Sequence, residues 1–288
     1  MIKYVILIPS FNDWDCLNLL IPKIDKVLHS LKEEVSILIV NDGSTEKENL
    51  SFKNLSFLKK IEVLNLKKNV KAQIAITTGL SFLKKKKFTG GIIVMDADGQ
   101  DNPEQIIDII EESKKKPNRT ITINRTTRKE EFIFKALYQI YLYMTFLFTF
   151  RYMRFGVYSY IHSDCLERIL STKDSQMAYA ASLEKHFNDK KIIYASRGLR
   201  IHGESKNNYK SLIIYALKII SVLRYKVLIN SLSLILIFFL FFNSKIFLLI
   251  SAPIIFFNII FFLIPHTIKT FDEENIILNI KDVKNLNY

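Results

Sequence analysis

Two long apolar stretches near the end of the chain set the strongest limit on its fold. They cover Val227–Phe242 and Ile246–Ile264, and only a short break ending at Lys245 separates them. Each approaches the roughly 20 residues that a helix needs to cross a bilayer. We therefore predict a transmembrane helical hairpin over residues 227–265, with both ends on one side of the membrane. A buried hairpin in a soluble protein is the alternative, which the absence of charge between Lys226 and Lys245 disfavours.

Basic residues lie mainly outside the turn of this hairpin, which contains only Lys245. The others near it are Lys206, Lys210, Lys218, Arg224, Lys226 and Lys269. By the positive-inside rule, the rest of the chain lies in the cytoplasm, at an inner (plasma) membrane of bacterial type. Residues 206–226 have a basic amphipathic pattern, typical of an interfacial helix on anionic lipid or of a helix packed on a domain. Residues 266–288 are expected to form a cytoplasmic tail.

The chain is strongly basic, with 41 Lys and Arg against 28 Asp and Glu and a formal net charge of +13. Such a balance favours an anionic partner, although lysine-rich proteins also use charge for solubility alone. No nucleic-acid-binding motif accompanies the charge, so we expect a membrane surface or a phosphorylated substrate. The two cysteines and five histidines have no spacing typical of a zinc site or a disulfide framework.

The first 125 residues alternate apolar strands with amphipathic helices, which predicts an α/β fold with a mostly parallel sheet covered on both faces. The expected strands are Tyr4–Pro9, Val35–Asn41, Lys60–Asn65, Gly91–Asp96 and Thr120–Asn124, and the expected helices are Cys16–Ser30, Val70–Lys85 and Pro103–Lys115. Ligands of such sheets bind at the carboxyl ends of the strands, where Asn12, Asp42 and Asp98 fall. The aromatic stretch 133–150 predicts a helix on the membrane or against the domain, with a third spanning helix left open.

Two aspartates end the fourth predicted strand, in the stretch VMDADGQDNPE. Alternation within a strand would direct Asp96 and Asp98 to the same side. Two carboxylates so placed can hold a divalent cation beside a phosphate, and hard oxygen ligands suit Mg²⁺ or Mn²⁺. A plain turn is the alternative interpretation of these residues.

Several motifs follow one another in an order that resembles a known family. IPSFND, VNDGS, KNVKAQIAITTGL and VMDADGQDNPE resemble the nucleotide-sugar-binding half of a family 2 glycosyltransferase with the GT-A fold. NRTTRKE, RFGVYSYI, SRGLRIHGESKNNY and the terminal hairpin extend the resemblance to polyprenyl-phosphate glycosyltransferases, the group of dolichol-phosphate mannose synthase. The resemblance covers about residues 3 to 265. It implies a Rossmann-like GT-A domain over 1–205, with a nucleotide-sugar half (about 1–125) and an acceptor half (about 126–205).

The resemblance also implies roles for individual residues of the donor site. The pocket for the base and ribose would include Pro9, Phe11, Asn12, Asp13 and Asp42. Lys71 opens a helix at its positive end, near the expected diphosphate, and members of this family commonly have glycine near Val70 or Lys71. For the stretch around Asp42, a turn with a helix cap is the alternative.

Asp98 is the strongest metal-ligand prediction, with Gln100 assisting and Asp96 bonding the donor sugar or the metal. Asp101 would act on the acceptor side of the catalytic site or cap the helix that begins at Pro103. These assignments come from the resemblance and make Mg²⁺ or Mn²⁺ the expected cofactor.

Four arginines supply the matching positive charge: Arg125, Arg128, Arg197 and Arg200. Arginine binds phosphate oxygens through paired N–H groups. The spacing of Arg197 and Arg200 with Ser205 resembles the mobile loop that closes on the diphosphate in this family, although a solvated basic loop is the alternative. Arg125 and Arg128 are candidates for the acceptor phosphate.

The predicted function is inverting transfer of a sugar from a UDP- or GDP-sugar to a polyprenyl phosphate, for cell-envelope glycan synthesis. The expected partners are a nucleotide-sugar, a polyprenyl phosphate and the bilayer, and a homo-oligomer is left open. One rival is transfer to a hydroxyl of a lipid-linked saccharide, which needs a general base such as Asp101. A non-catalytic membrane scaffold would show damaged acids or arginines. A nucleotidyltransferase would need an early glycine-rich loop, and the first glycine is Gly43.

Overall fold

A computed structural model describes residues 3–126, 132–150, 152–203 and 209–286. The chain divides into two units. The sheet unit contains Met1–Lys129, Phe155–Ser205 and Thr270–Tyr288, and the helical unit contains Glu130–Arg154 and Lys206–Lys269. The structure therefore groups part of the predicted acceptor half with the C-terminal helices, and it groups the end of the predicted tail with the sheet.

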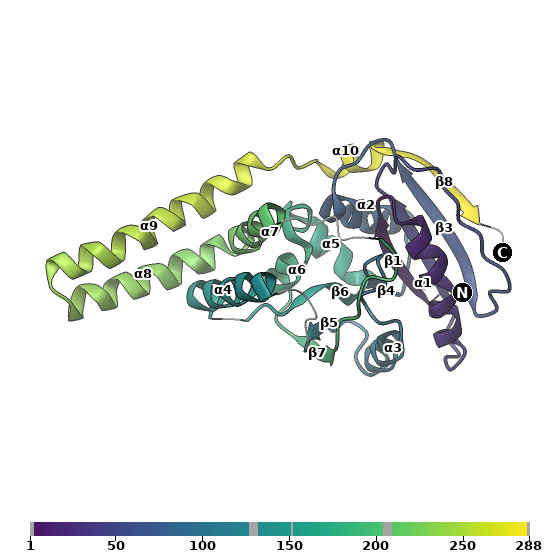
Figure 1. Cartoon of the computed structure of the whole chain (residues 1–288), viewed down its shortest axis with the longest axis horizontal. Helices are drawn as coiled ribbons and strands as arrows, with labels where there is room; N and C mark the ends of the chain where they lie inside the picture. The colour runs from purple at the N-terminus through teal and green to yellow at the C-terminus, as the bar shows by residue number, and fades with distance from the viewer. Residues whose placement is uncertain (1–2, 127–131, 151, 204–208, 287–288) are drawn as a thin grey trace. The chain divides into compact units, whose positions relative to one another are not determined.

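The sheet unit is built on an eight-stranded sheet of order β7-β5-β6-β4-β1-β2-β3-β8 (Figure 1). Its strands are β1 (Tyr4–Ser10), β2 (Val35–Asn41), β3 (Leu58–Leu66), β4 (Gly91–Val94), β5 (Thr120–Arg125), β6 (Phe155–His162), β7 (Lys190–Ala195) and β8 (Ile280–Leu286). Strands β1 to β4 run parallel, as does the β5–β7 pair, whereas β6 and β8 pair antiparallel with their neighbours. The predicted α/β fold is confirmed.

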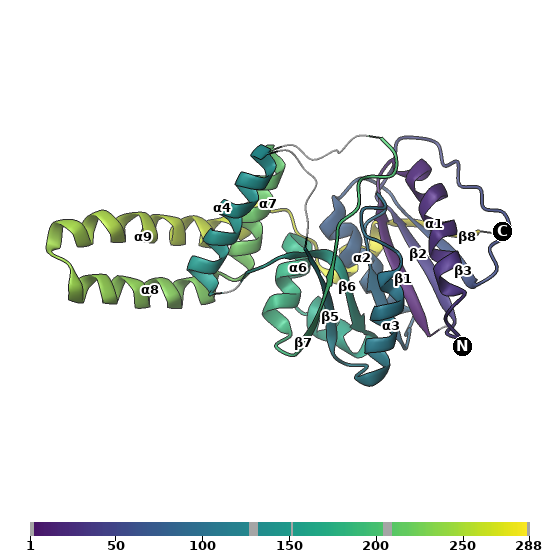
Figure 2. The same ribbon diagram turned by 60° about the horizontal axis from the view of Figure 1, so that its bottom comes forward.

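Helices cover both faces of this sheet because alternate strand residues point to opposite sides. Ile6 and Ile8 of β1 pack in a core with α1 (Trp14–Leu28) and α3 (Gln105–Lys115). Val5 and Leu7 pack in the second core, to which three other helices contribute (Figure 2). Those helices are α2 (Ala72–Lys85), α5 (Leu166–Leu170), which follows the short 3-10 turn Ser163–Cys165, and α6 (Asp174–His186).

The strand that precedes the aspartate pair is shorter than predicted. Strand β4 ends at Val94, so Asp96 and Asp98 lie in the following loop and strand alternation does not set their directions. Strand β6, which the sequence did not predict, inserts between β4 and β5 and pairs antiparallel with both. It brings Gly156 next to the end of β5.

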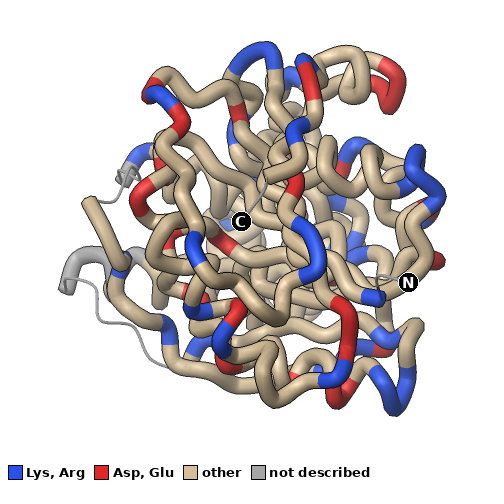
Figure 3. Tube along the Cα trace, turned by 90° about the vertical axis from the view of Figure 1, so that its right-hand side faces the viewer, with Lys and Arg blue, Asp and Glu red and all other residues tan. Residues whose placement is uncertain are grey.

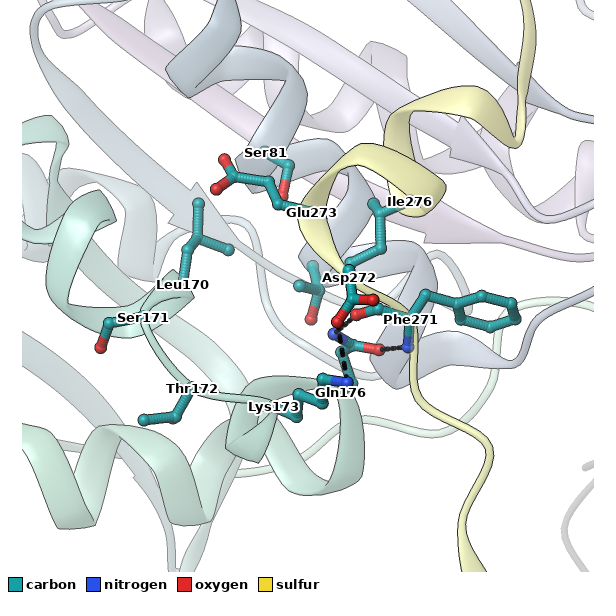
Figure 4. Close-up of a pocket in the computed structure, with 11 residues that line it drawn as sticks. Ser81, Leu170, Ser171, Thr172, Lys173, Gln176, Phe271, Asp272, Glu273 and Ile276 are labelled. Carbon is teal, nitrogen blue, oxygen red and sulfur yellow. Dashed lines mark hydrogen bonds and ion pairs between the residues drawn. The ribbon is translucent and has the colours of Figure 1, made fainter.

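The last residues of the sheet unit return to it after the helical segment. Gln176 holds Phe271 by two hydrogen bonds, donating to its carbonyl at 2.7 Å and accepting its N–H at 2.8 Å. Helix α10 (Glu273–Leu278) follows, and β8 then pairs with β3, where Asn65 donates to Asp282. A pocket of about 170 Å³ lies between α10, α2 and the α5–α6 connection (Figure 4). Residues 270–286 thus complete an edge of the sheet.

The helical unit contains α4 (Phe132–Thr149), α7 (Tyr209–Val222), α8 (Arg224–Phe241) and α9 (Ser244–Thr267). Helices α8 and α9 lie side by side as a hairpin (Figure 1), and buried Asn258 donates to Ser231 across them at 2.9 Å. Among the described residues, these two helices are long and apolar enough to cross a membrane.

Candidate functional site

The parallel strands of the sheet unit end level with one another, and polar residues follow those ends. Ser10 of β1 pairs with Asn41 of β2, which pairs with Asn65 of β3. The loops beyond β1, β2 and β4 carry Asp13, Asp42 and the aspartate pair. The structure therefore brings the predicted acidic residues to one edge of the sheet, as expected for an α/β fold.

The loop after β4, which we call the acid loop (residues 96–101), is folded by its own hydrogen bonds. The Asp101 carboxylate accepts the Asp96 N–H at 3.1 Å, and the Asp98 carboxylate accepts the Gln100 N–H at 3.0 Å. Asp101 therefore braces the loop and does not cap α3. These hydrogen bonds form a turn, one of the two interpretations of these residues, and the metal site stays a prediction.

A second loop packs directly on the acid loop. We call residues 196–203 the arginine loop. Its Gly198 N–H donates to the Gln100 carbonyl at 2.8 Å and its Ile201 N–H to the Asp98 carbonyl at 3.0 Å. Gly99 has a φ of +72°, and a Cβ there would lie 1.9 Å from the Ile201 side chain. Glycine suits this position, because the backbone conformation strains any other residue and a side chain would have to displace Ile201.

The arginines reach the acidic residues from two directions. In the arginine loop, Arg200 forms an ion pair with Asp13 and lies 3.8 Å from Asp98, measured from Nη1 to Oδ2. Arg197 Nη2 lies 3.9 Å from Asp96 Oδ2. From the end of β5, Arg125 Nη2 lies 4.0 Å from Asp96 Oδ2 and 3.8 Å from Asp101 Oδ1. Arg128 and Ser205 lie outside the described residues.

Burial and mutual repulsion shape the ionisation of the acid loop. Burial raises the pKa of Asp96 first, and the charges of Asp101 and Asp98 raise it further, against the opposing effect of Arg197 and Arg125. Burial also raises the pKa of Asp98. Additional positive charge at this point would stabilise both carboxylates.

The residue set fits a metal that is completed by substrate. Among residues with described positions, no group of three or more His, Cys, Asp or Glu could hold a metal ion alone. Mg²⁺ commonly takes one or two carboxylates together with nucleotide phosphates, and Asp96 and Asp98 could supply those carboxylates. The Gln100 side chain donates to the Gly198 carbonyl at 3.4 Å, so it contacts the arginine loop.

The residues predicted to bind the base and the ribose also hold neighbouring loops together. Pro9 is buried within β1 and Phe11 is half-buried. The Asn12 side chain accepts the Thr45 and Glu46 N–H groups at 2.9 and 3.2 Å, which ties the loop after β1 to the loop after β2.

Asp42 and Lys71 meet at the start of α2. Asp42 is only 3% exposed, and its carboxylate accepts the Val70 N–H at 2.7 Å. Burial, opposed by the Val70 and Lys71 backbone, raises the pKa of Asp42 to about 6. Exposed Lys71 has a φ of +75°, a conformation that favours glycine.

Two contributors to the site were not predicted as site residues from the sequence. Gly156 of β6 provides the surface on which the Arg125 guanidinium lies, and the Cys16 thiol donates to the His202 carbonyl at 3.4 Å. Both depend on contacts between segments far apart in the chain, which a single sequence does not reveal.

Comparison with known proteins identifies related sequences. A model of glycosyl transferase family 2 matches residues 5–169. The uncharacterized glycosyltransferase YkcC of Bacillus subtilis is 31% identical over 135 residues, covering 46% of this chain and 40% of that protein. The uncharacterized glycosyltransferase sll0501 of Synechocystis is 29% identical over 152 residues, covering 50% and 46%. This chain matches less than half the length of these relatives.

Solved structures with similar folds are more distant in sequence. Residues 1–349 of TarS from S. aureus are 14% identical, with a TM-score of 0.46, covering 80% of this chain and 65% of that one. Glucosyl-3-phosphoglycerate synthase from Mycobacterium tuberculosis, solved with Mn²⁺, UDP and glucosyl-3-phosphoglycerate, is 11% identical with a TM-score of 0.48. That match covers 78% of this chain and 79% of the synthase.

Proposed function

Because this chain belongs to glycosyl transferase family 2 and is a glycosyltransferase with the GT-A fold, we propose that its acceptor is a polyprenyl phosphate. The donor is a UDP- or GDP-sugar, and the sugar is transferred with inversion at the anomeric carbon. The reaction takes place at the cytoplasmic face of an inner membrane of bacterial type and serves cell-envelope glycan synthesis.

One observation supports a lipid phosphate as the acceptor. The sequence has no Asp or Glu from Phe132 to Arg154 or from Lys206 to Lys269, which together form nearly all of the helical unit. The same stretches carry ten Lys and Arg residues, at positions 135, 151, 154, 206, 210, 218, 224, 226, 245 and 269. A concentration of basic residues beside apolar helices attracts an anionic lipid headgroup. The sheet unit, in contrast, mixes both signs of charge over the face that Figure 3 shows.

Exposed apolar side chains of the helical unit support a membrane setting. On α4, Ile140, Tyr143 and Leu147 lie on one face and are 58%, 66% and 46% exposed. On the hairpin, Phe241 and Leu249 are 78% and 75% exposed. Apolar surface of this extent is typical of contact with lipid.

The surroundings of Asp101 favour a phosphate over a hydroxyl acceptor. Asp101 is 5% exposed, and its carboxylate is already bonded to the Asp96 N–H and near Arg125. A hydroxyl acceptor needs a general base that can reach its proton. A phosphate acceptor is ionised at neutral pH, so it needs orientation and no base.

The proposed reaction uses the acid loop and the arginine loop together. An oxygen of the acceptor phosphate attacks the anomeric carbon, the bond from that carbon to the diphosphate breaks, and the nucleoside diphosphate leaves with the electron pair. Asp98, with Asp96, would hold a divalent cation that supplies positive charge at the departing diphosphate. Arg197 and Arg200 would stabilise the same charge, so Arg200 exchanges its pairing with Asp13 and Asp98 for phosphate oxygens.

The test is an incorporation assay with membranes that contain the protein. A panel of radiolabelled UDP- and GDP-sugars is supplied with Mg²⁺ or Mn²⁺, and the lipids are then extracted. We expect label from one donor in the lipid extract and none with Asp98→Ala. Unchanged transfer by Asp98→Ala would contradict the metal assignment, and label found only in water-soluble saccharide would contradict the lipid acceptor.

A further inference from the structure

We infer that Arg125 is a positioning residue, whose guanidinium rests on Gly156 and holds Asp96 and Asp101 of the acid loop in place instead of binding the acceptor phosphate. This inference rests on the proposed function, because the acid loop is taken as the part that binds the metal and the donor. It differs from binding of the acceptor phosphate, for which the sequence made Arg125 a candidate.

The Arg125 guanidinium is largely buried and faces the acid loop. Its side chain is only 14% exposed, and a single nitrogen, Nη2, approaches both Asp96 and Asp101, at 4.0 and 3.8 Å. These two residues are the ends of the acid loop. One cation therefore bridges the first and last carboxylates of the loop that contains Asp98.

A glycine in the neighbouring strand makes this position possible. Strand β6 pairs antiparallel with β5, and Asn124 pairs with Phe155. A Cβ on Gly156 would lie 2.5 Å from Arg125 Nη2 and 3.0 Å from Cζ. Any other residue would push the guanidinium away from the carboxylates, although the backbone there could accept a side chain.

The hydrogen bonds of the acid loop show why the bridge matters. One Asp101 oxygen accepts the Asp96 N–H, and the other faces Arg125. Without Arg125, the nearby carboxylates would lack their shared counter-charge, and their repulsion would open the loop. Loss of one partner from a buried ion pair is costly because the remaining charge is uncompensated.

Electrostatics also disfavour Arg125 as an acceptor ligand. A phosphate approaching this guanidinium would meet Asp96 and Asp101 within 4.0 Å of the same nitrogen. The two carboxylates offset the single positive charge of Arg125, so little attraction remains for a further anion.

Gly156→Ala tests the inference without changing any charge. The probe is UDP with Mn²⁺, whose binding to the purified protein is measured by titration calorimetry, and Arg125→Gln and Arg125→Lys are measured beside it. Residues that orient metal ligands typically change metal affinity or activity by about 10- to 100-fold when replaced. We expect losses of that order for Gly156→Ala and Arg125→Gln and a smaller loss for Arg125→Lys.

The double variant provides the internal control. If Gly156 acts only by seating Arg125, Gly156→Ala should cost nothing further in the Arg125→Gln background. Independent, additive losses would show a general steric effect of the alanine and would contradict the inference.

Steady-state kinetics distinguish a positioning role of Arg125 from binding of the acceptor phosphate. A positioning residue lowers kcat and leaves the KM for polyprenyl phosphate unchanged, whereas an acceptor ligand raises that KM. Unchanged UDP–Mn²⁺ binding by Arg125→Gln would overturn the inference. If wild-type protein transfers no sugar to polyprenyl phosphate, the proposed function fails, but the binding comparison still decides the role of Arg125.

Discussion

Asp42 is a buried carboxylate whose protonation should be visible in the stability of the protein. Its pKa is raised to about 6 from the model-compound value of 3.8. The folded state therefore binds a proton more readily than the unfolded state. The stabilisation that accompanies protonation is fully present below pH 3.8 and is lost as the pH rises through 6.

Asp42→Asn removes this dependence, and the comparison isolates it from other titrating groups. We expect the difference in unfolding free energy between wild type and variant to shift by about 2 kcal/mol, in favour of wild type, from neutral pH to about pH 4. Chemical unfolding in detergent micelles at both pH values measures this shift. The same difference at both values would contradict the burial of a charged Asp42.

At the residue scale, the positions of the predicted strand ends indicated which polar residues lie close together better than local sequence patterns did. Asp13, Asp98 and Arg200 come from separate loops, and the structure places them together, as the order of strands and motifs led us to expect. The contact of Arg125 with Gly156 had no such signal, because it depends on β6 pairing beside β5. From the sequence alone, Arg125 was therefore a candidate for binding the acceptor phosphate.

At the scale of elements, Gln176 of α6 makes a specific connection to the returning chain. Gln176→Ala removes both hydrogen bonds to the Phe271 backbone. Each of these part-buried hydrogen bonds contributes about 0.5–1.5 kcal/mol, so the segment with α10 and β8 should detach more often. We expect faster tryptic cleavage at Lys281 and Lys284. Gln139→Ala, at an exposed position of α4, is the matched control.

Equal cleavage rates for Gln176→Ala and wild type would show that β8 is held without this connection. In that case the pairing of β8 with β3 and the Asn65 contact with Asp282 would suffice to hold the segment.

The sequence predicted the elements whose apolar pattern is strong and missed those defined by their neighbours. The five expected strands and three expected helices are present, with β4 ending two residues early at Val94. Strand β8 reads IKDVKNL, and an edge strand with so many polar residues lacks the pattern of a buried strand. Strand β6 is buried, but its antiparallel insertion depends on pairing with distant segments.

At the scale of the whole molecule, chain connectivity constrains the membrane topology. The segment with α8 and α9 lies between Ser205 and Thr270, which both belong to the sheet unit. A hairpin that spans a membrane must therefore return to its starting side. The sequence predicted this from the short break alone, although it treated the final residues as a separate tail.

Single-cysteine labelling tests that topology. The native Cys16 and Cys165 are 1% and 9% exposed, so they should give little background. We expect a membrane-impermeant maleimide to label Lys245→Cys, in the turn, in intact cells. Lys281→Cys, in β8, should react only after permeabilisation. Labelling of both positions from the same side would contradict a spanning hairpin.

We propose that a phosphate on a polyprenyl chain accepts the sugar. The most direct measurement supplies purified protein with its donor and either polyprenyl phosphate or a prenyl-diphosphate-linked sugar, and identifies the products by mass spectrometry. We expect a polyprenyl phosphate that has gained one sugar, in a reaction that Asp98→Ala abolishes. Transfer only to the lipid-linked sugar would contradict the phosphate acceptor and would show that the protein uses a hydroxyl acceptor.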